Sequence, residues 1–105
     1  MSMLNTKLDQ RGLLTASLDN PPVNALSRVL VDELNKLCDN AQEEIVRMVV
    51  ITAGGENFCA GADLKEREKV DDTEVETFVQ YLSDTFQRIV EIPVPTLAAI
   101  NGNCL

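Results

Sequence analysis

The sequence predicts an α/β domain, and three observations carry that prediction. Val46 to Thr52 is a nearly continuous β-branched run, typical of a strand buried on both faces in a parallel sheet. Stripes of apolar residues at helical spacing lie on both sides of that run, at about 28–42 and 75–90. The 105 residues, 45% hydrophobic and 25% charged, have the length and composition of one globular domain, so we expect residues 1–105 to lie in a single domain.

The first segment, residues 3–18, predicts a β-hairpin. Asp9 and Gly12 stand at the first and last positions of a type I turn. After the turn, apolar and hydroxyl residues alternate up to Leu18, which is strand periodicity. Pro21 and Pro22 cannot donate to a sheet ladder, so the strand should stop before them.

Helix starts are predicted from capping residues. Ser27 is a good N-cap for a helix over about 28–42. Asp63 with Glu66 has capping-box spacing and predicts a short helix. Thr73 with Glu76 predicts the N-terminus of a longer amphipathic helix.

The last predicted elements follow from the prolines near the end of the chain. The long helix should end before Pro93, because the residue before a proline disfavours helical geometry. Residues 95–100 then predict a second buried strand, closed by a turn at Asn101–Asn103.

Composition excludes several classes of function. Nine basic against seventeen acidic residues give a net charge of −8 with no basic stripe, so we expect no nucleic-acid partner. The absence of histidine excludes a Ser-His-Asp triad and a histidine metal site, and we expect no metal. The three cysteines, Cys38, Cys59 and Cys104, have no C-x-x-C spacing and are expected to be small buried hydrophobes in a reducing compartment. Without an apolar run of membrane-spanning length or a leader pattern, we expect a soluble, cytoplasmic protein that does not contact membranes.

One loop has the composition of a ligand site. Small residues at 60–62 let a ligand approach the backbone, and a helix opening at Asp63 would direct unpaired amides toward an anion or oxyanion. The only local basic cluster, Lys65, Arg67 and Lys69, follows. The same residues also fit a plain turn into a capped, solvated helix with Asp63 as its N-cap, and periodicity alone favours that interpretation.

Four stretches together resemble the enoyl-CoA hydratase/isomerase (crotonase) superfamily. They are 21–27 (PPVNALS), 46–52 (VRMVVIT), 58–64 (FCAGADL) and 98–102 (AAING), in the order and separation that this family shows. The resemblance covers essentially the whole chain, and 58–67 is most similar to the enoyl-CoA and methylglutaconyl-CoA hydratase branches.

The resemblance implies a fold, a substrate and a site. The fold is the ClpP/crotonase-like arrangement of stacked ββα units, of which this chain would be the N-terminal part, and members form trimers, often hexamers. The substrate is an acyl-CoA thioester, with no other cofactor. The thioester carbonyl is held by two backbone amides, the first belonging here to Ala62. The acyl-CoA would contact residues in the A-G-A-D-L-K stretch, with the Ala60 carbonyl near adenine and Lys65 near the phosphates: Ala60, Gly61, Ala62, Asp63, Leu64 and Lys65.

The resemblance also implies what a hydratase needs besides this stretch. A Gly-rich segment with the second amide, and two glutamates, are expected beyond Leu105, so we expect the chain to be truncated there and inactive alone. An isomerase, lyase or decarboxylase of the same superfamily remains open, as does a non-catalytic acyl-CoA-binding or assembly module. A free-standing nucleotide-binding domain has no phosphate-loop motif to support it.

Overall fold

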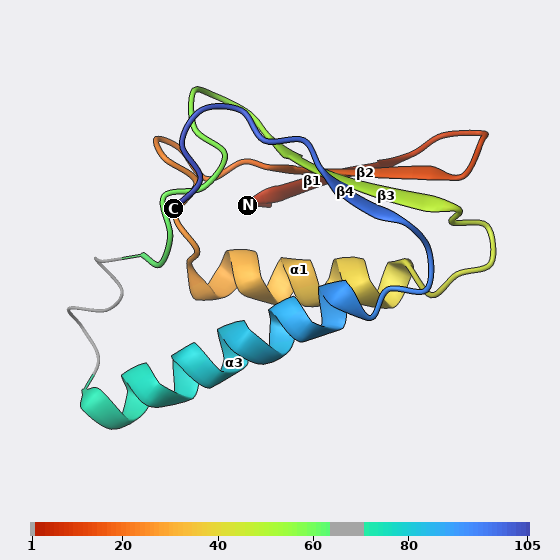
Figure 1. Cartoon of the computed structure of the whole chain (residues 1–105). Coiled ribbons are helices and arrows are strands. Elements are labelled where there is room, and N and C mark those ends of the chain that lie inside the picture. The colour runs from red at the N-terminus through yellow and green to blue at the C-terminus, as the bar shows by residue number, and fades with distance from the viewer. Residues whose placement is uncertain (1, 64–70) are drawn as a thin grey trace.

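A computed structural model describes residues 2–63 and 71–105, which form one four-stranded sheet with two helices on the same side (Figure 1). The strands lie in the order β1-β2-β3-β4; β1 and β2 are antiparallel, and the other pairs are parallel. The α/β prediction is confirmed. The elements are β1 (Leu4–Leu8), β2 (Leu13–Leu18), α1 (Arg28–Asn40), β3 (Met48–Ala53), α3 (Asp72–Val90) and β4 (Thr96–Ala98).

The predicted hairpin is confirmed, and its turn is fixed by one aspartate. The Gly12 amide donates to the Asp9 carbonyl at 3.1 Å, and Gly12 has a φ of 89°, a left-handed conformation that favours glycine. The Asp9 carboxylate accepts from the amides of Arg11 (2.8 Å) and Leu13 (3.0 Å). These hydrogen bonds from backbone N–H groups, of which the one from Leu13 has the largest effect, hold the pKa of Asp9 below its usual value.

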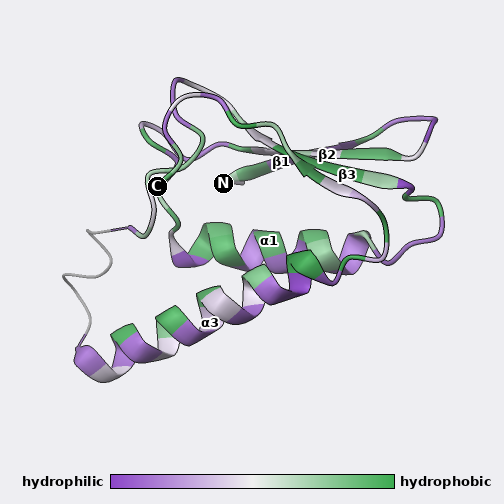
Figure 2. Cartoon of the chain, in the orientation of Figure 1, coloured by the Kyte–Doolittle hydropathy of each residue, from purple (hydrophilic) through white to green (hydrophobic). Residues whose placement is uncertain are grey.

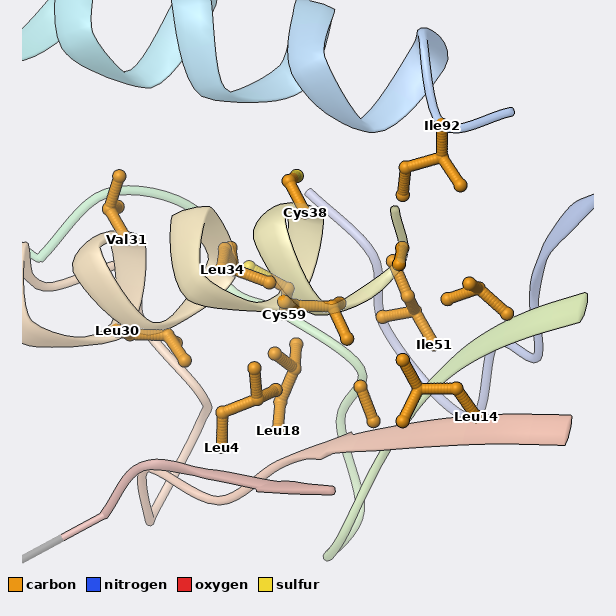
Figure 3. Packing of buried hydrophobic residues seen from close by; sticks show 14 of the residues in the cluster. Leu4, Leu14, Leu18, Leu30, Val31, Leu34, Cys38, Ile51, Cys59 and Ile92 are labelled. Atoms are coloured by element: carbon orange, nitrogen blue, oxygen red, sulfur yellow. The ribbon is translucent and has the colours of Figure 1, made fainter. Parts of the chain in front are cut away.

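Helix α1 forms the core with the sheet. The Ser27 hydroxyl accepts from the Leu30 amide at 3.2 Å, which confirms it as the N-cap, and the helix ends close to the expected residue 42. Figure 3 shows Leu30 and Leu34 directed toward the hairpin, and Figure 2 shows that α1 and the strands are largely apolar where they meet. The buried side chains from these elements are Leu4, Leu14, Ala16, Leu18, Leu30, Val31, Leu34, Leu37, Cys38, Val49 and Ile51.

Helix α3 packs on the outer side of α1, so the layers run sheet, α1, α3 (Figure 1). Its N-cap is Asp71, whose carboxylate accepts from the Glu74 amide at 2.9 Å, and the prediction of Thr73 was wrong. The pair 71 and 74 has the same spacing as the predicted capping box, and the Thr73 carbonyl instead accepts from the Thr77 hydroxyl inside the helix. The helix ends at Val90, before the proline, as predicted.

Two burial predictions were wrong. In β3, Val49 and Ile51 are buried while the alternate residues, Met48, Val50 and Thr52, are only half-buried, because α1 covers one face of the sheet. β4 forms, but all three of its residues are exposed, and Leu97 is 52% exposed. Within residues 2–63 and 71–105, no helix lies on the opposite face (Figure 1). Among the same residues, no helix is long and apolar enough to cross a membrane.

Candidate functional site

The backbone of residues 58–63 lies between two other segments and pairs with both. On one side the Leu26 amide donates to the Gly61 carbonyl (2.7 Å), and the Asp63 amide donates to the Leu26 carbonyl (3.2 Å). Also on this side, the Ala60 amide donates to the Val23 carbonyl at 3.0 Å. This pairing brings the stretch 21–27 against the loop that the sequence singled out as a ligand site.

On the other side, the same loop pairs with the end of the chain. The amides of Phe58 and Cys59 both donate to the Asn103 carbonyl, at 3.0 and 3.2 Å. The Leu105 amide donates to the Cys59 carbonyl at 2.9 Å, which makes Cys59 and Cys104 partners in a parallel β-bridge. Two of the four stretches behind the family resemblance, 21–27 and 58–64, therefore meet at one place, together with the residues that directly follow the stretch 98–102.

The Ala62 amide has no hydrogen-bond acceptor among residues 2–63 and 71–105, although the amides around it do. Ala62 is the partner of Leu26 in a parallel β-bridge. The two hydrogen bonds of that bridge are made by the Gly61 carbonyl and the Asp63 amide, on either side of Ala62. The Gly61 amide donates to the Cys59 Sγ at 3.4 Å. Ala62 is an exposed residue, and its N–H is a hydrogen-bond donor that none of the described residues uses.

Asn24 holds the segment that approaches this loop, and no motif in the sequence predicted a role for it. It is buried, with only 3% of its surface exposed, and has a φ of 55°, which asparagine tolerates better than most residues. Its side-chain amide donates to the carbonyls of Gly54 (3.0 Å) and Asn57 (2.8 Å), and its Oδ1 accepts from the Asn20 amide (2.8 Å). Asn24 thus joins the loop after β2 to the loop after β3. An asparagine inside a proline-rich break is a turn signal, which was the one available indication.

Gly102 sets the contact between the chain end and the loop after β3. Its φ is 66°, and a Cβ built there would lie 1.8 Å from the Glu56 carbonyl oxygen. Next to it, the Asn101 side-chain amide donates to the Gly55 carbonyl at 3.0 Å. The predicted turn at 101–103 therefore also docks residues 103–105 against 56–59.

The three cysteines differ in their surroundings. Cys38 and Cys59 are buried, as predicted, and burial raises the pKa of both thiols. Cys104 is exposed, so the prediction that it is a buried hydrophobe was wrong. It lies in an exposed chain end beside the loop, outside the core under α1.

The structure places part of the predicted acyl-CoA stretch and leaves the rest undescribed. Ala60 and Gly61 lie between the two bridges, Ala62 forms the bridge to Leu26, and Asp63 directly follows it. Leu64 and Lys65, and the short helix expected after Asp63, lie outside the described residues. Within residues 2–63 and 71–105, no three potential metal-ligating side chains are grouped.

Comparison with known proteins identifies relatives of this arrangement. The enoyl-CoA hydratase/isomerase family model matches residues 9–105. The chain is 45% identical over 84 residues to mouse (Mus musculus) mitochondrial enoyl-CoA hydratase domain-containing protein 2, covering 78% of this chain and 28% of that protein. It is 38% identical over 100 residues to mouse mitochondrial methylglutaconyl-CoA hydratase, covering 92% and 32%.

A solved structure gives the same result for the fold. The crystal structure of enoyl-CoA hydratase from Bacillus anthracis superposes with a TM-score of 0.90 at 33% identity, covering 96% of this chain and 40% of that one. The crotonase-like fold is therefore confirmed for this N-terminal region. The chain spans about a third of the length of the two mouse relatives.

Proposed function

Because this chain belongs to the enoyl-CoA hydratase/isomerase family, we propose that it supplies the acyl-CoA-binding region of an enoyl-CoA hydratase. The observation that carries the proposal is the backbone amide of the exposed residue Ala62, which has no acceptor among residues 2–63 and 71–105. The ligand is an enoyl-CoA thioester, and no metal or redox cofactor takes part in the proposed reaction.

The proposed role of the Ala62 amide is to donate to the thioester oxygen. When water adds to the β-carbon of the double bond, negative charge moves onto that oxygen, and a fixed N–H stabilises the developing charge. The Ala62 N–H is held in place because both of its neighbours, Gly61 and Asp63, form hydrogen bonds with Leu26. The second amide and the two glutamates expected for hydration correspond to the part of the relatives that this chain does not span, so hydration is proposed for a protein that carries that part.

A second candidate is isomerisation of the enoyl-CoA double bond. The matching family includes isomerases as well as hydratases, and both reactions place charge on the thioester oxygen. The same amide serves both, and the acid and base groups distinguish them. Analysis of the product, a hydroxyacyl-CoA or a shifted double bond, separates the two in the longer protein.

Binding of an enoyl-CoA such as crotonyl-CoA to the chain tests the proposal. Ala62→Pro removes the N–H while leaving the groups that bond to Leu26 in place, and Ala62→Ser keeps the N–H as the matched control. Loss of one neutral hydrogen bond, about 0.5–1.5 kcal/mol, should weaken binding by about 2- to 13-fold in Ala62→Pro only. In a protein with the complete site, the loss in kcat should be about 10²–10³-fold.

Two results would contradict this proposal. One is a folded parent chain that does not bind crotonyl-CoA in a calorimetric titration. The other is a folded Ala62→Pro variant, checked by circular dichroism, with the affinity of the parent. Binding by the parent without turnover in the longer protein would instead support a non-catalytic acyl-CoA-binding module.

A further inference from the structure

Two cysteine residues are direct partners across the bridge beside the proposed site. The Cys59 amide donates to the Asn103 carbonyl and the Cys59 carbonyl accepts from the Leu105 amide, so Cys104 lies directly opposite Cys59. Paired residues on adjacent strands project to the same side of the pleat. Their Cα atoms are separated by about one strand spacing, ~4.8 Å, which lies inside the range of about 4.4–6.8 Å found in disulfides.

The two thiols have unequal access to solvent. Cys104 is exposed, whereas Cys59 is only 7% exposed and its Sγ accepts from the Gly61 amide. A soluble oxidant therefore reaches Cys104 first, and Cys59 is placed to react with the product. Cys38 belongs to α1 and lies on the side of that helix toward Ile92 and α3, away from Cys59 (Figure 3).

We propose that Cys59 and Cys104 form a reversible disulfide, a redox modification site on the loop that carries the Ala62 amide. The oxidant is a low-molecular-weight disulfide such as glutathione disulfide. The Cys104 thiolate attacks one sulfur of the oxidant, giving a mixed disulfide and releasing one glutathione thiol. The Cys59 thiolate then attacks the Cys104 sulfur and releases the second glutathione. Two protein thiols are oxidised, and one glutathione disulfide is reduced to two thiols.

Oxidation changes the loop at the residue before Ala62. Oxidation replaces the Cys59 thiol, which accepts from the Gly61 amide at 3.4 Å, by a disulfide sulfur bonded to Cys104, so we expect this hydrogen bond to weaken or break. The Ala60–Gly61 peptide group, one position before the peptide that carries the Ala62 N–H, then loses this hydrogen bond. The consequence for ligand affinity rests on the proposed function, whereas the disulfide itself does not.

Formation of the disulfide is tested on the whole chain with glutathione disulfide, followed by alkylation, digestion and mass spectrometry. We expect a cross-linked pair of peptides containing residues 59 and 104, with Cys38 the one cysteine still alkylated. Cys38→Ser should give the same cross-link, and Cys104→Ser should give none. Because Cys104 is exposed, Cys104→Ser keeps the core intact. A mixed disulfide that persists at Cys104 with Cys59 still alkylated, or a covalent dimer through Cys104, would overturn the proposal.

Crotonyl-CoA binding by the reduced and oxidised forms tests the effect on the site. We expect lower affinity after oxidation, restored by dithiothreitol, and no change in Cys104→Ser under the same treatment. Equal affinities of the two forms would overturn the regulatory part. A reduced chain that does not bind crotonyl-CoA contradicts the proposed function alone, because the cross-link is detected independently.

Discussion

Replacement of Asn24 should destabilise the loops after β2 and β3, which hold the candidate site. Its side chain makes three hydrogen bonds, to Asn20, Gly54 and Asn57, from a buried position. At about 0.5–1.5 kcal/mol each, their loss should lower the free energy of unfolding by about 1.5–4.5 kcal/mol. That is a large part of the ~5–15 kcal/mol that stabilises an ordinary domain.

Two variants separate the hydrogen bonds from the backbone conformation. Asn24→Gly removes the side chain but accepts the observed φ of 55°, so it should show the hydrogen-bond loss without left-handed strain. Asn24→Ala should be less stable than Asn24→Gly by about 1 kcal/mol, because alanine resists that conformation.

Urea unfolding followed by circular dichroism measures both differences. The reasoning fails if Asn24→Gly unfolds with a free energy within about 0.5 kcal/mol of the parent, the range of ordinary surface substitutions. It also fails if the glycine variant is the less stable of the two, since strain at φ 55° would then be unimportant.

Three further predictions address other parts of the chain. In urea unfolding, Gly102→Ala should destabilise the chain far more than Gly55→Ala. Both glycines have positive φ, but only at Gly102 would the added Cβ lie 1.8 Å from a backbone atom, so equal losses of stability would contradict this. Because the pKa of Asp9 is lowered in the folded chain, its contribution to stability is present above the usual value of 3.8 and is lost as pH falls through the folded pKa. Asp9→Asn should therefore reduce the pH dependence of the free energy of unfolding between about pH 5 and pH 2. The pKa of Tyr81 is raised, chiefly by the hydrogen bond that its hydroxyl donates to Asp32 at 2.6 Å, so Asp32→Asn should lower the midpoint of an ultraviolet titration; an unchanged midpoint would refute that cause.

Local signals in the sequence predicted the elements that depend on neighbouring residues. The hairpin followed from the turn at Asp9–Gly12, and α1 followed from the Ser27 cap with its apolar stripe. The start of α3 was misplaced by two residues because Asp71 and Thr73 are both suitable caps with an acidic residue three positions later. Sequence spacing alone does not decide between two equivalent capping boxes.

Burial was harder to predict because it depends on what covers each face. The apolar run at β3 favoured a strand buried on both faces and the run at β4 favoured a second buried strand, and both strands formed. In residues 2–63 and 71–105, however, α1 and α3 stack on the same side of the sheet, so Leu97 of β4 is left exposed. Apolar composition predicts that a strand belongs to a covered sheet but does not say which segment supplies the cover.

The sequence predicted which small residues form the candidate site but not the hydrogen-bond pattern that distinguishes Ala62. Small residues at 60–62 indicated that a ligand could approach the backbone, but any small-residue turn has that property. The distinctive feature of Ala62 is that its bridge to Leu26 engages the groups on either side of it and leaves its own N–H without an acceptor among residues 2–63 and 71–105. That alternation is a consequence of strand pairing between segments 36 positions apart, with Asn24 holding one of them. A donor whose freedom depends on distant pairing is sensitive to any change in that pairing, so substitutions at Asn24 should reduce ligand affinity as well as stability.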